Sequence, residues 1–383
     1  MANPITLTGI TWNHTRGYLP MVATAQRFSE LHPDIEIVWH KRSLQEFADY
    51  PIERLVERFD LLVIDHPFAG YAAAHNVLLP LDGHLSPEFL SEQATGSVGQ
   101  SHPSYTFDGH QWALAIDAAT PVSSYRPDLL EKYEIELPQT WEALLDLARQ
   151  GWVALPAIAV DSLMNFYMLS IALGAEPFTG EDRVVSREIG VAALEHLREL
   201  VSLCAPACLK RNPITTYEVM TTTDDIVYCP FAYGYSNYAR PGYACSELRF
   251  GGLVSFAGQR LRSTLGGTGL AISAHCRHVE HAVNYARFVA EPSCQRGLFF
   301  TSGGQSGHRS AWEDNLVNAA SNNFFKDTFQ TLDEAYLRPR YDGYLHFQDE
   351  AGSLVHHYLV TGGNPRAVMD KMEKLRERSR RSS

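Results

Sequence analysis

The chain has 383 residues, of which 45% are hydrophobic and 20% charged, and its formal net charge is −12 at pH 7. This length allows two lobes with a sizeable core, and the composition is that of an ordinary soluble globular protein. The negative charge argues against nucleic acid and anionic membranes as partners, because both would repel the chain. No apolar run reaches the ~18 residues that a membrane span needs.

The amino-terminal residues and the cysteines bear on the cellular compartment. Residues 1–4 lack the basic and apolar regions of a signal peptide, and a strand pattern begins at once. The sequence as it stands therefore predicts a cytoplasmic protein, whereas a leader trimmed from it would make the protein periplasmic. The six cysteines are too few for a disulfide framework, and no second close pair accompanies Cys204 and Cys208 as a zinc site requires. We expect free thiols, no metal and no cofactor.

The first 65 residues alternate between strand and helix patterns. Apolar residues alternate over 5–9, take helical spacing over 20–32 and alternate again over 35–39. A short helix is predicted over 54–59, and the apolar run 61–64 is typical of a strand buried in a parallel sheet. This order predicts an α/β lobe that binds its ligands at the carboxyl ends of its strands.

The stretch ITWNHTRGY, residues 10–18, lies at one such strand end. An aromatic ring there can stack on an apolar ligand face, while Asn13 and His14 can form hydrogen bonds. Arg16 can clamp a carboxylate with two parallel bonds. Trp12, Asn13, His14 and Arg16 are thus candidate ligand contacts. The alternative is that Trp12 belongs to the core and Arg16 to the surface.

Two further strand ends carry acidic residues. Asp65 and His66 follow the apolar strand 61–64, and Asp117 follows a predicted strand over 113–116. Buried strands usually end in residues that face a binding site, so all three are candidates. Asp65 could instead cap a helix that begins at Pro67, and Asp117 could form a hinge hydrogen bond.

Several motifs, in order along the chain, resemble those of family 1 extracellular solute-binding proteins, which serve sugar-type ABC importers. The motifs are Ser124-Tyr125-Arg126-Pro127-Asp128-Leu129, Pro138-Gln139-Thr140-Trp141, Gly266-Gly267-Thr268-Gly269-Leu270-Ala271-Ile272-Ser273 and residues 302–309. Thr140 is a good helix N-cap in the second motif. Arg126 stands where the family has an asparagine, and Gly307-His308 where it has a proline.

The resemblance implies an α/β fold of the type II periplasmic-binding-protein class, with two lobes and the ligand in the cleft between them. Lobe one would comprise residues 1–116 and 270–309, and lobe two residues 117–269 and 310–383, ending in C-terminal helices. The implied function is capture of a small polar solute, carbohydrate or sugar-acid-like, by hinge closure of the lobes. The implied partners are that solute and the membrane subunits of an ABC transporter. We expect a monomer.

The later part of the chain adds candidate ligand contacts. Asn165 and Tyr167 lie at the start of a predicted helix and could line the cleft, but a helix packed on the sheet would also bury Met164 and Phe166. Tyr233 and Tyr235 flank a glycine, which predicts exposed rings in a loop. The resemblance adds Gln305. Gly267 belongs to a glycine-rich segment predicted to precede a strand, as a hinge or cleft-edge loop rather than a nucleotide-binding loop.

The same residues permit a function of another class. Without a leader, the protein could be a cytoplasmic lyase, hydratase or hydrolase acting on an acidic substrate. His14, Asp65, His66 and Asp117 would then supply general acid and base groups. A cytoplasmic solute sensor is a third possibility, because one fold can host binding and catalysis.

Overall fold

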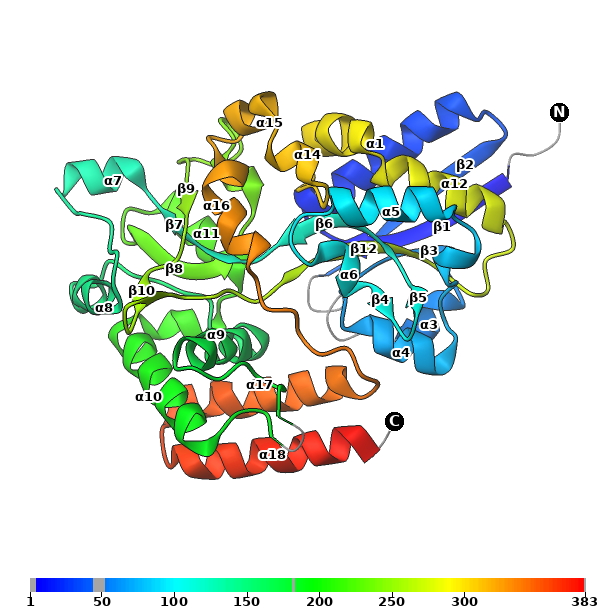
Figure 1. The fold of residues 1–383 in the computed structure, drawn as a ribbon. Coiled ribbons are helices and arrows are strands. Elements are labelled where there is room, and N and C mark those ends of the chain that lie inside the picture. The colour runs from blue at the N-terminus through cyan, green and yellow to red at the C-terminus, as the bar shows by residue number, and fades with distance from the viewer. Residues whose placement is uncertain (1–4, 44–51, 181–182, 382–383) are drawn as a thin grey trace. The chain divides into compact units, whose positions relative to one another are not determined.

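The computed structural model describes residues 5–43, 52–180 and 183–381 (Figure 1). The first four residues, on which the prediction about a leader rests, lie outside this part. The chain divides into two compact units, Met1–Ala119 with Leu265–Ala319 and Thr120–Thr264 with Ala320–Ser383. The resemblance predicts crossings after residues 116, 269 and 309, whereas the two units change after residues 119, 264 and 319. Within the described residues, no helix combines the length and apolar character of a membrane span.

The first unit is built on a five-stranded sheet in the order β2-β1-β3-β12-β6. β1 is parallel to β2 and β3, whereas β12 runs antiparallel to both β3 and β6. β3 consists only of buried apolar residues, as expected of a strand covered on both faces. The strands of this sheet are β1 (Ile5–Trp12), β2 (Ile35–Arg42), β3 (Leu61–Ile64), β6 (Leu114–Ala119) and β12 (Gly266–Ile272).

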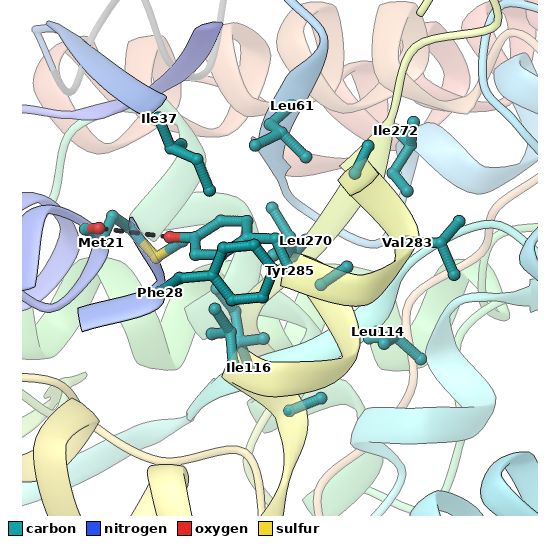
Figure 2. Packing of buried hydrophobic residues seen from close by; sticks show 14 of the residues in the cluster. Met21, Phe28, Ile37, Leu61, Leu114, Ile116, Leu270, Ile272, Val283 and Tyr285 are labelled. Atoms are coloured by element: carbon teal, nitrogen blue, oxygen red, sulfur yellow. Dashed lines mark hydrogen bonds between the residues drawn. The ribbon is translucent and has the colours of Figure 1, made fainter. Parts of the chain in front are cut away.

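Helices α1 and α12 pack on this sheet and form its main core (Figure 2). The Tyr285 hydroxyl lies in this core and donates a hydrogen bond to the Met21 carbonyl oxygen, at 3.2 Å. The remaining elements of the first unit are α1 (Thr15–Leu31), α3 (Ile52–Val56), α4 (Phe68–His75), η1 (Leu81–Gly83), α5 (Pro87–Gly96), α6 (Ser101–Ser104), β4 (Thr106–Phe107), β5 (His110–Gln111), α12 (Val279–Ala290), α13 (Pro292–Cys294), η4 (Gln295–Phe299), α14 (Arg309–Trp312) and α15 (Asn315–Ala320).

The first helix begins earlier than its apolar spacing predicts. α1 starts at Thr15 rather than at residue 20, because the His14 ring nitrogen Nδ1 accepts a hydrogen bond from the Arg16 amide and caps the helix. Pro20 therefore lies inside the helix instead of in its first turn. Most of the stretch 10–18 is thus a helix cap and first turn, not a loop.

The second unit contains an antiparallel sheet in the order β8-β7-β9 and a layer in which α17 packs on α9 and α18 (Figure 1). Thr140 caps α8 as predicted, accepting a hydrogen bond from the Ala143 amide. Its elements are β7 (Pro121–Tyr125), α7 (Pro127–Lys132), α8 (Trp141–Arg149), α9 (Ala159–Ala172), α10 (Arg187–Leu203), η2 (Pro206–Lys210), α11 (Pro213–Thr222), β8 (Tyr228–Tyr233), η3 (Ser236–Ala239), β9 (Arg249–Gly251), β10 (Ser255–Phe256), β11 (Gln259–Arg260), α16 (Phe324–Asp333), α17 (Tyr344–Thr361) and α18 (Pro365–Arg381).

Candidate binding site

Topology brings three of the predicted strand-end positions to one edge of the first unit. β12 is antiparallel to both β3 and β6, so β1, β3 and β6 all point the same way. The residues around the ends of these strands, His14, Asp65 and Asp117, therefore meet at that edge together with Gly267 at the start of β12. This agrees with the rule that open α/β sheets bind ligands at their carboxyl edge.

The centre of this edge is a buried ion pair between Arg16 and Asp117. Arg16 Nε donates to Asp117 Oδ2 at 2.7 Å and Arg16 Nη2 donates to Oδ1 at 2.5 Å, with side-chain exposures of 4% and 1%. Burial raises the pKa of the Asp117 carboxyl, while Arg16 and the Thr268 amide oppose that rise. The two-pronged clamp predicted for Arg16 is therefore present, but its carboxylate is the chain's own Asp117, so the prediction of a free clamp for a ligand was wrong.

His14 is an uncharged acceptor at neutral pH. Burial, aided by the nearby Arg16 guanidinium, lowers the pKa of His14 to about 4. Its Nδ1 accepts the Arg16 amide at 3.0 Å. A nitrogen already used as a helix cap is poorly suited to abstract a proton, so His14 acts here chiefly as a structural acceptor beside the ion pair.

Trp12 and Asn13 differ in their surroundings. Trp12 is 4% exposed and belongs to the hydrophobic core of the first unit, where a side chain on Gly17 would collide with its ring. The alternative that Trp12 is a core residue is thus what the structure shows, and a stacking role for its ring is a correction. Asn13 follows β1 directly and is exposed, so its amide can reach a bound molecule.

Asp65 and His66 form a local pair after β3. Asp65 Oδ1 accepts the His66 amide at 2.8 Å and lies 3.1 Å from His66 Nδ1. His66 is fully buried with its ring edge-on to Tyr105, whereas the Asp65 side chain is 25% exposed. Asp65 does not cap α4, whose N-cap is Pro67 without a side-chain bond. Of the two, only Asp65 presents its side chain at the surface.

Gly267 and Gln305 hold the backbone around Asp117. Gly267 has φ +99°, and a β-carbon there would lie 2.4 Å from the Asp117 carbonyl oxygen, so the chain passes close to another backbone as predicted. It does so inside β12, not in a loop before a strand, which corrects the predicted boundary. Gln305 is buried and donates through Nε2 to the Ala118 carbonyl oxygen at 2.8 Å. Its side chain supports the edge and does not face outward.

Gln295 is a supporting residue that the sequence motifs did not single out. Its Oε1 accepts hydrogen bonds from Ser306 Oγ at 2.7 Å and from the Gly307 amide at 3.0 Å. Its Nε2 donates to the Val289 carbonyl oxygen at 2.9 Å. This side chain ties segment 305–307 to the end of α12. A glutamine inside an otherwise helical pattern carries no signal for such a role.

The candidates of the second unit are largely internal. Asn165 and Tyr167 lie buried within α9, where Asn165 Nδ2 donates to the Pro156 carbonyl oxygen and Tyr167 packs edge-on against Phe178 and Tyr336. Met164 and Phe166 are buried in this helix as the alternative predicted, and Asn165 and Tyr167 are buried with them. We correct their assignment as ligand contacts accordingly.

Tyr233 and Tyr235 occupy different settings. Tyr233 ends β8 and is half-buried, with its hydroxyl 3.2 Å from Thr264 Oγ1. Tyr235 precedes η3 and is 6% exposed, with its ring near Tyr217. The prediction of an exposed ring fails for Tyr235, because its side chain is buried near Tyr217. Tyr233 stays a predicted contact.

The departures from the family motifs have local explanations. Arg126 donates through Nη1 to the carbonyl oxygens of Met220 and Thr223, at 2.7 and 2.9 Å. It thereby satisfies carbonyl groups at the end of α11, which helix termini leave open. His308 caps α14, accepting the Ser310 amide through Nδ1 at 3.2 Å. Both residues are built into the structure at positions where no ligand is needed to explain them.

Among the residues that the structure describes, no three or more His, Cys, Asp or Glu side chains are grouped in a way that could hold a metal ion.

Comparisons with known proteins agree with this architecture. Residues 11–201 match the model of a family described as bacterial extracellular solute-binding protein. The maltose-bound MalE3 protein of T. maritima is 17% identical, with a TM-score of 0.86 over 97% of this chain and 99% of that one. A ribitol-bound ABC transporter solute-binding protein of Agrobacterium radiobacter K84 is 18% identical, with a TM-score of 0.82 over 97% and 98%. One of Agrobacterium vitis S4 with bound D-mannitol is 16% identical, with a TM-score of 0.77 over 98% of each chain. At such identities, these structures establish a shared two-lobed periplasmic-binding-protein fold.

Proposed function

Because the chain belongs to the bacterial extracellular solute-binding proteins, we propose that it captures an uncharged carbohydrate or polyol and delivers it to an ABC importer. The observation that most supports an uncharged ligand is the buried Arg16–Asp117 ion pair. The structurally similar proteins named above hold maltose, ribitol and D-mannitol, all of them neutral polyhydroxyl compounds.

The charges at the sheet edge favour a neutral ligand over a sugar acid. Asp117 already neutralises the guanidinium of Arg16 through two short bonds. An anionic ligand would have to displace Asp117, and breaking a buried ion pair leaves a charge without compensation at a cost of roughly 3–5 kcal/mol. His14 adds no positive charge, because its pKa of about 4 keeps it neutral at pH 7.

The remaining groups at this edge suit hydroxyl groups. Asn13 offers both a donor and an acceptor, and the partly exposed Asp65 carboxylate accepts. A hydroxyl can donate to one and accept from the other without any net charge. Sites of this kind combine a few fixed polar groups with the exclusion of water, and the ligand remains chemically unchanged.

A thermal-shift screen tests the proposal. The purified protein is heated with maltose, ribitol, D-mannitol and the corresponding sugar acids, and every hit is followed by NMR for conversion. A binder at a hundredfold excess over its dissociation constant stabilises the folded state by about 2.7 kcal/mol. We expect neutral compounds to raise the melting temperature and to stay unchanged. Conversion of a hit, lost in Asp65→Asn, would instead identify an enzyme on this fold.

The cellular location of the protein distinguishes a role in solute import from a role in solute sensing. A binding protein that feeds an importer works outside the cytoplasm, so the proposal includes periplasmic or surface location. Fractionation of cells that express the natural gene, read with an antibody against the chain, checks this. Recovery in the cytoplasmic fraction would favour a solute sensor.

A further inference from the structure

Segment 305–307 lies along the outer edge of β6. β6 is the last strand of the five-stranded sheet and pairs with β12 on one side only. On its other side, two backbone hydrogen bonds of 3.1 Å join it to the segment, from the Ala118 amide to the Gln305 carbonyl oxygen and from the Gly307 amide to the Ile116 carbonyl oxygen. These bonds flank Asp117, which pairs with Ser306 in a β-bridge. The backbone of Asp117 is thus fixed between β12 and segment 305–307.

Gln295 holds this segment in place. Its side chain is fully buried, and its Oε1 accepts hydrogen bonds from Ser306 Oγ at 2.7 Å and from the Gly307 amide at 3.0 Å. Its Nε2 donates to the Val289 carbonyl oxygen at 2.9 Å, near the end of α12. Two donors therefore face one end of the amide and an acceptor faces the other, an arrangement that suits the amide of a glutamine.

The ion pair depends on where the Asp117 backbone lies. The aspartate side chain is short, and its two oxygen atoms accept from Arg16 Nη2 at 2.5 Å and from Arg16 Nε at 2.7 Å. Both side chains are buried, which increases their dependence on each other. A two-pronged bond needs both distances and both angles at once, so a shift of the Asp117 backbone weakens it. Release of segment 305–307 should therefore reach the pair.

We propose that Gln295 is a positioning residue for the Arg16–Asp117 pair. By fixing segment 305–307, it keeps the Asp117 carboxylate where both bonds to Arg16 can form. Without this support the pair loosens, and Arg16 becomes able to bind another carboxylate. Gln295 thereby helps to determine that the site takes uncharged ligands, a consequence that rests on the proposed function.

The chain offers a second buried glutamine as a matched control. Gln93 lies on α5, and its Nε2 donates to the Ala290 carbonyl oxygen at 3.3 Å, next to the residue that Gln295 binds. Within the described part of the chain, its side chain has no hydrogen bond to segment 305–307. Gln295→Met and Gln93→Met each remove one buried amide and keep an unbranched side chain. Urea denaturation of both variants shows whether they lose similar stability.

The NMR signal of the Arg16 Nε–H group reports the pair directly, and its loss in Arg16→Met identifies it. We expect Gln295→Met to move this signal towards its position in Asp117→Asn and to speed its exchange with water by about tenfold, because local opening becomes easier. Gln93→Met should leave the signal as in the wild type. Ser306→Ala removes only one bond to Gln295 and, as the milder variant, should cause a smaller change in the same direction. An unchanged signal in Gln295→Met and Ser306→Ala, or an equal change in Gln93→Met, would overturn the proposal.

Ligand titration tests the consequence for specificity. With D-mannitol and D-mannonate as probes, Gln295→Met should reduce the preference for the neutral compound by about threefold or more, and Gln93→Met should not. An unchanged preference alongside a changed Arg16 signal would overturn the effect on ligand charge. If the wild type binds neither compound, the proposed function fails for these ligands, while the NMR experiment still decides the role of Gln295.

Discussion

Among the described residues, each unit of the protein buries one aspartate almost completely, and the two aspartates have opposite surroundings. In the first unit, Asp117 is 2% exposed and receives two hydrogen bonds from Arg16. In the second unit, Asp161 is 4% exposed, and its Oδ2 has no hydrogen-bond partner within the described part of the chain. Burial raises the pKa of Asp161 to about 8, so this side chain is mostly protonated at neutral pH.

The difference shows that a buried carboxyl can be accommodated either by pairing its charge or by suppressing it. Pairing with Arg16 opposes the effect of burial on the pKa of Asp117, and Asp117 in turn offsets the charge of Arg16, so the pair presents little net charge to a ligand. Asp161 is instead kept protonated by burial, and it stays neutral only while the pH is below its pKa of about 8. The two sites should therefore respond differently to mutation and to pH.

The largest effect should follow from breaking the pair at one partner. Arg16→Met leaves the Asp117 charge buried and uncompensated, and we expect a loss of about 4 kcal/mol in the free energy of unfolding. The double variant Arg16→Met, Asp117→Leu should recover most of this loss. Urea denaturation measures both. The exposed pair Arg27–Glu30 provides the control, since Arg27→Met should not measurably change stability. A double variant as unstable as the single one would show that the pair's charge is not the cause.

The next effect concerns the unpaired carboxyl. The folded-state pKa of Asp161 lies above its unfolded value, so its ionisation lowers stability as pH rises from about 4 to 8. Asp161→Asn removes that ionisation and should stabilise the protein by about 3 kcal/mol at pH 6 and hardly at all at pH 4. Denaturation curves across this range test it, with exposed Asp146→Asn as the control. An equal increase in the free energy of unfolding at both pH values would show that the ionisation of Asp161 is not the cause.

A smaller effect should follow at the glycine that lies against Asp117. Gly267→Ala combines a positive φ with a β-carbon 2.4 Å from a carbonyl oxygen, and we expect a loss of about 2 kcal/mol. Gly258 has φ +79° but open space around its β-carbon position, so Gly258→Ala isolates the backbone conformation. If both variants lose the same stability by thermal denaturation, the contact with Asp117 contributes nothing.

The smallest effect concerns the helix cap beside the pair. His14→Ala removes the acceptor for the Arg16 amide and should cost about 1 kcal/mol at pH 7. His14→Asn supplies an oxygen acceptor in place of the ring nitrogen and should restore most of the lost stability. Since the folded pKa of His14 is about 4, the wild-type stability from its neutral form is lost as pH falls from about 6.5 to 4. Equal stability of His14→Ala and His14→Asn would rule out capping.

Local patterns predicted much of the fold and less of the site. Alternating and helical spacing placed the first strands and helices, because side-chain periodicity follows directly from backbone geometry. The order of the motifs along the chain predicted the two-lobed periplasmic-binding-protein fold. The cap by His14 was missed, since histidine is not among the preferred N-cap residues.

The contacts that define the site are not local. Arg16 and Asp117 are 101 residues apart, and each was predicted separately to face a ligand, whereas they face each other. No spacing rule reveals such a pairing, because it depends on which strands become neighbours in the sheet. Tyr167 and Gln305 illustrate the same limit, since polar side chains near strand or helix ends can serve internal packing as readily as binding.

Calorimetric titration of the protein with a neutral polyol and with the sugar acid of the same carbon skeleton, such as D-mannitol and D-mannonate, tests most directly whether the ligand is uncharged. We expect the neutral compound to bind at least tenfold more tightly, about 1.4 kcal/mol, because Arg16 is already paired with Asp117. Tighter binding of the acid, abolished in Arg16→Met, would show that a ligand carboxylate replaces Asp117 and would contradict the account.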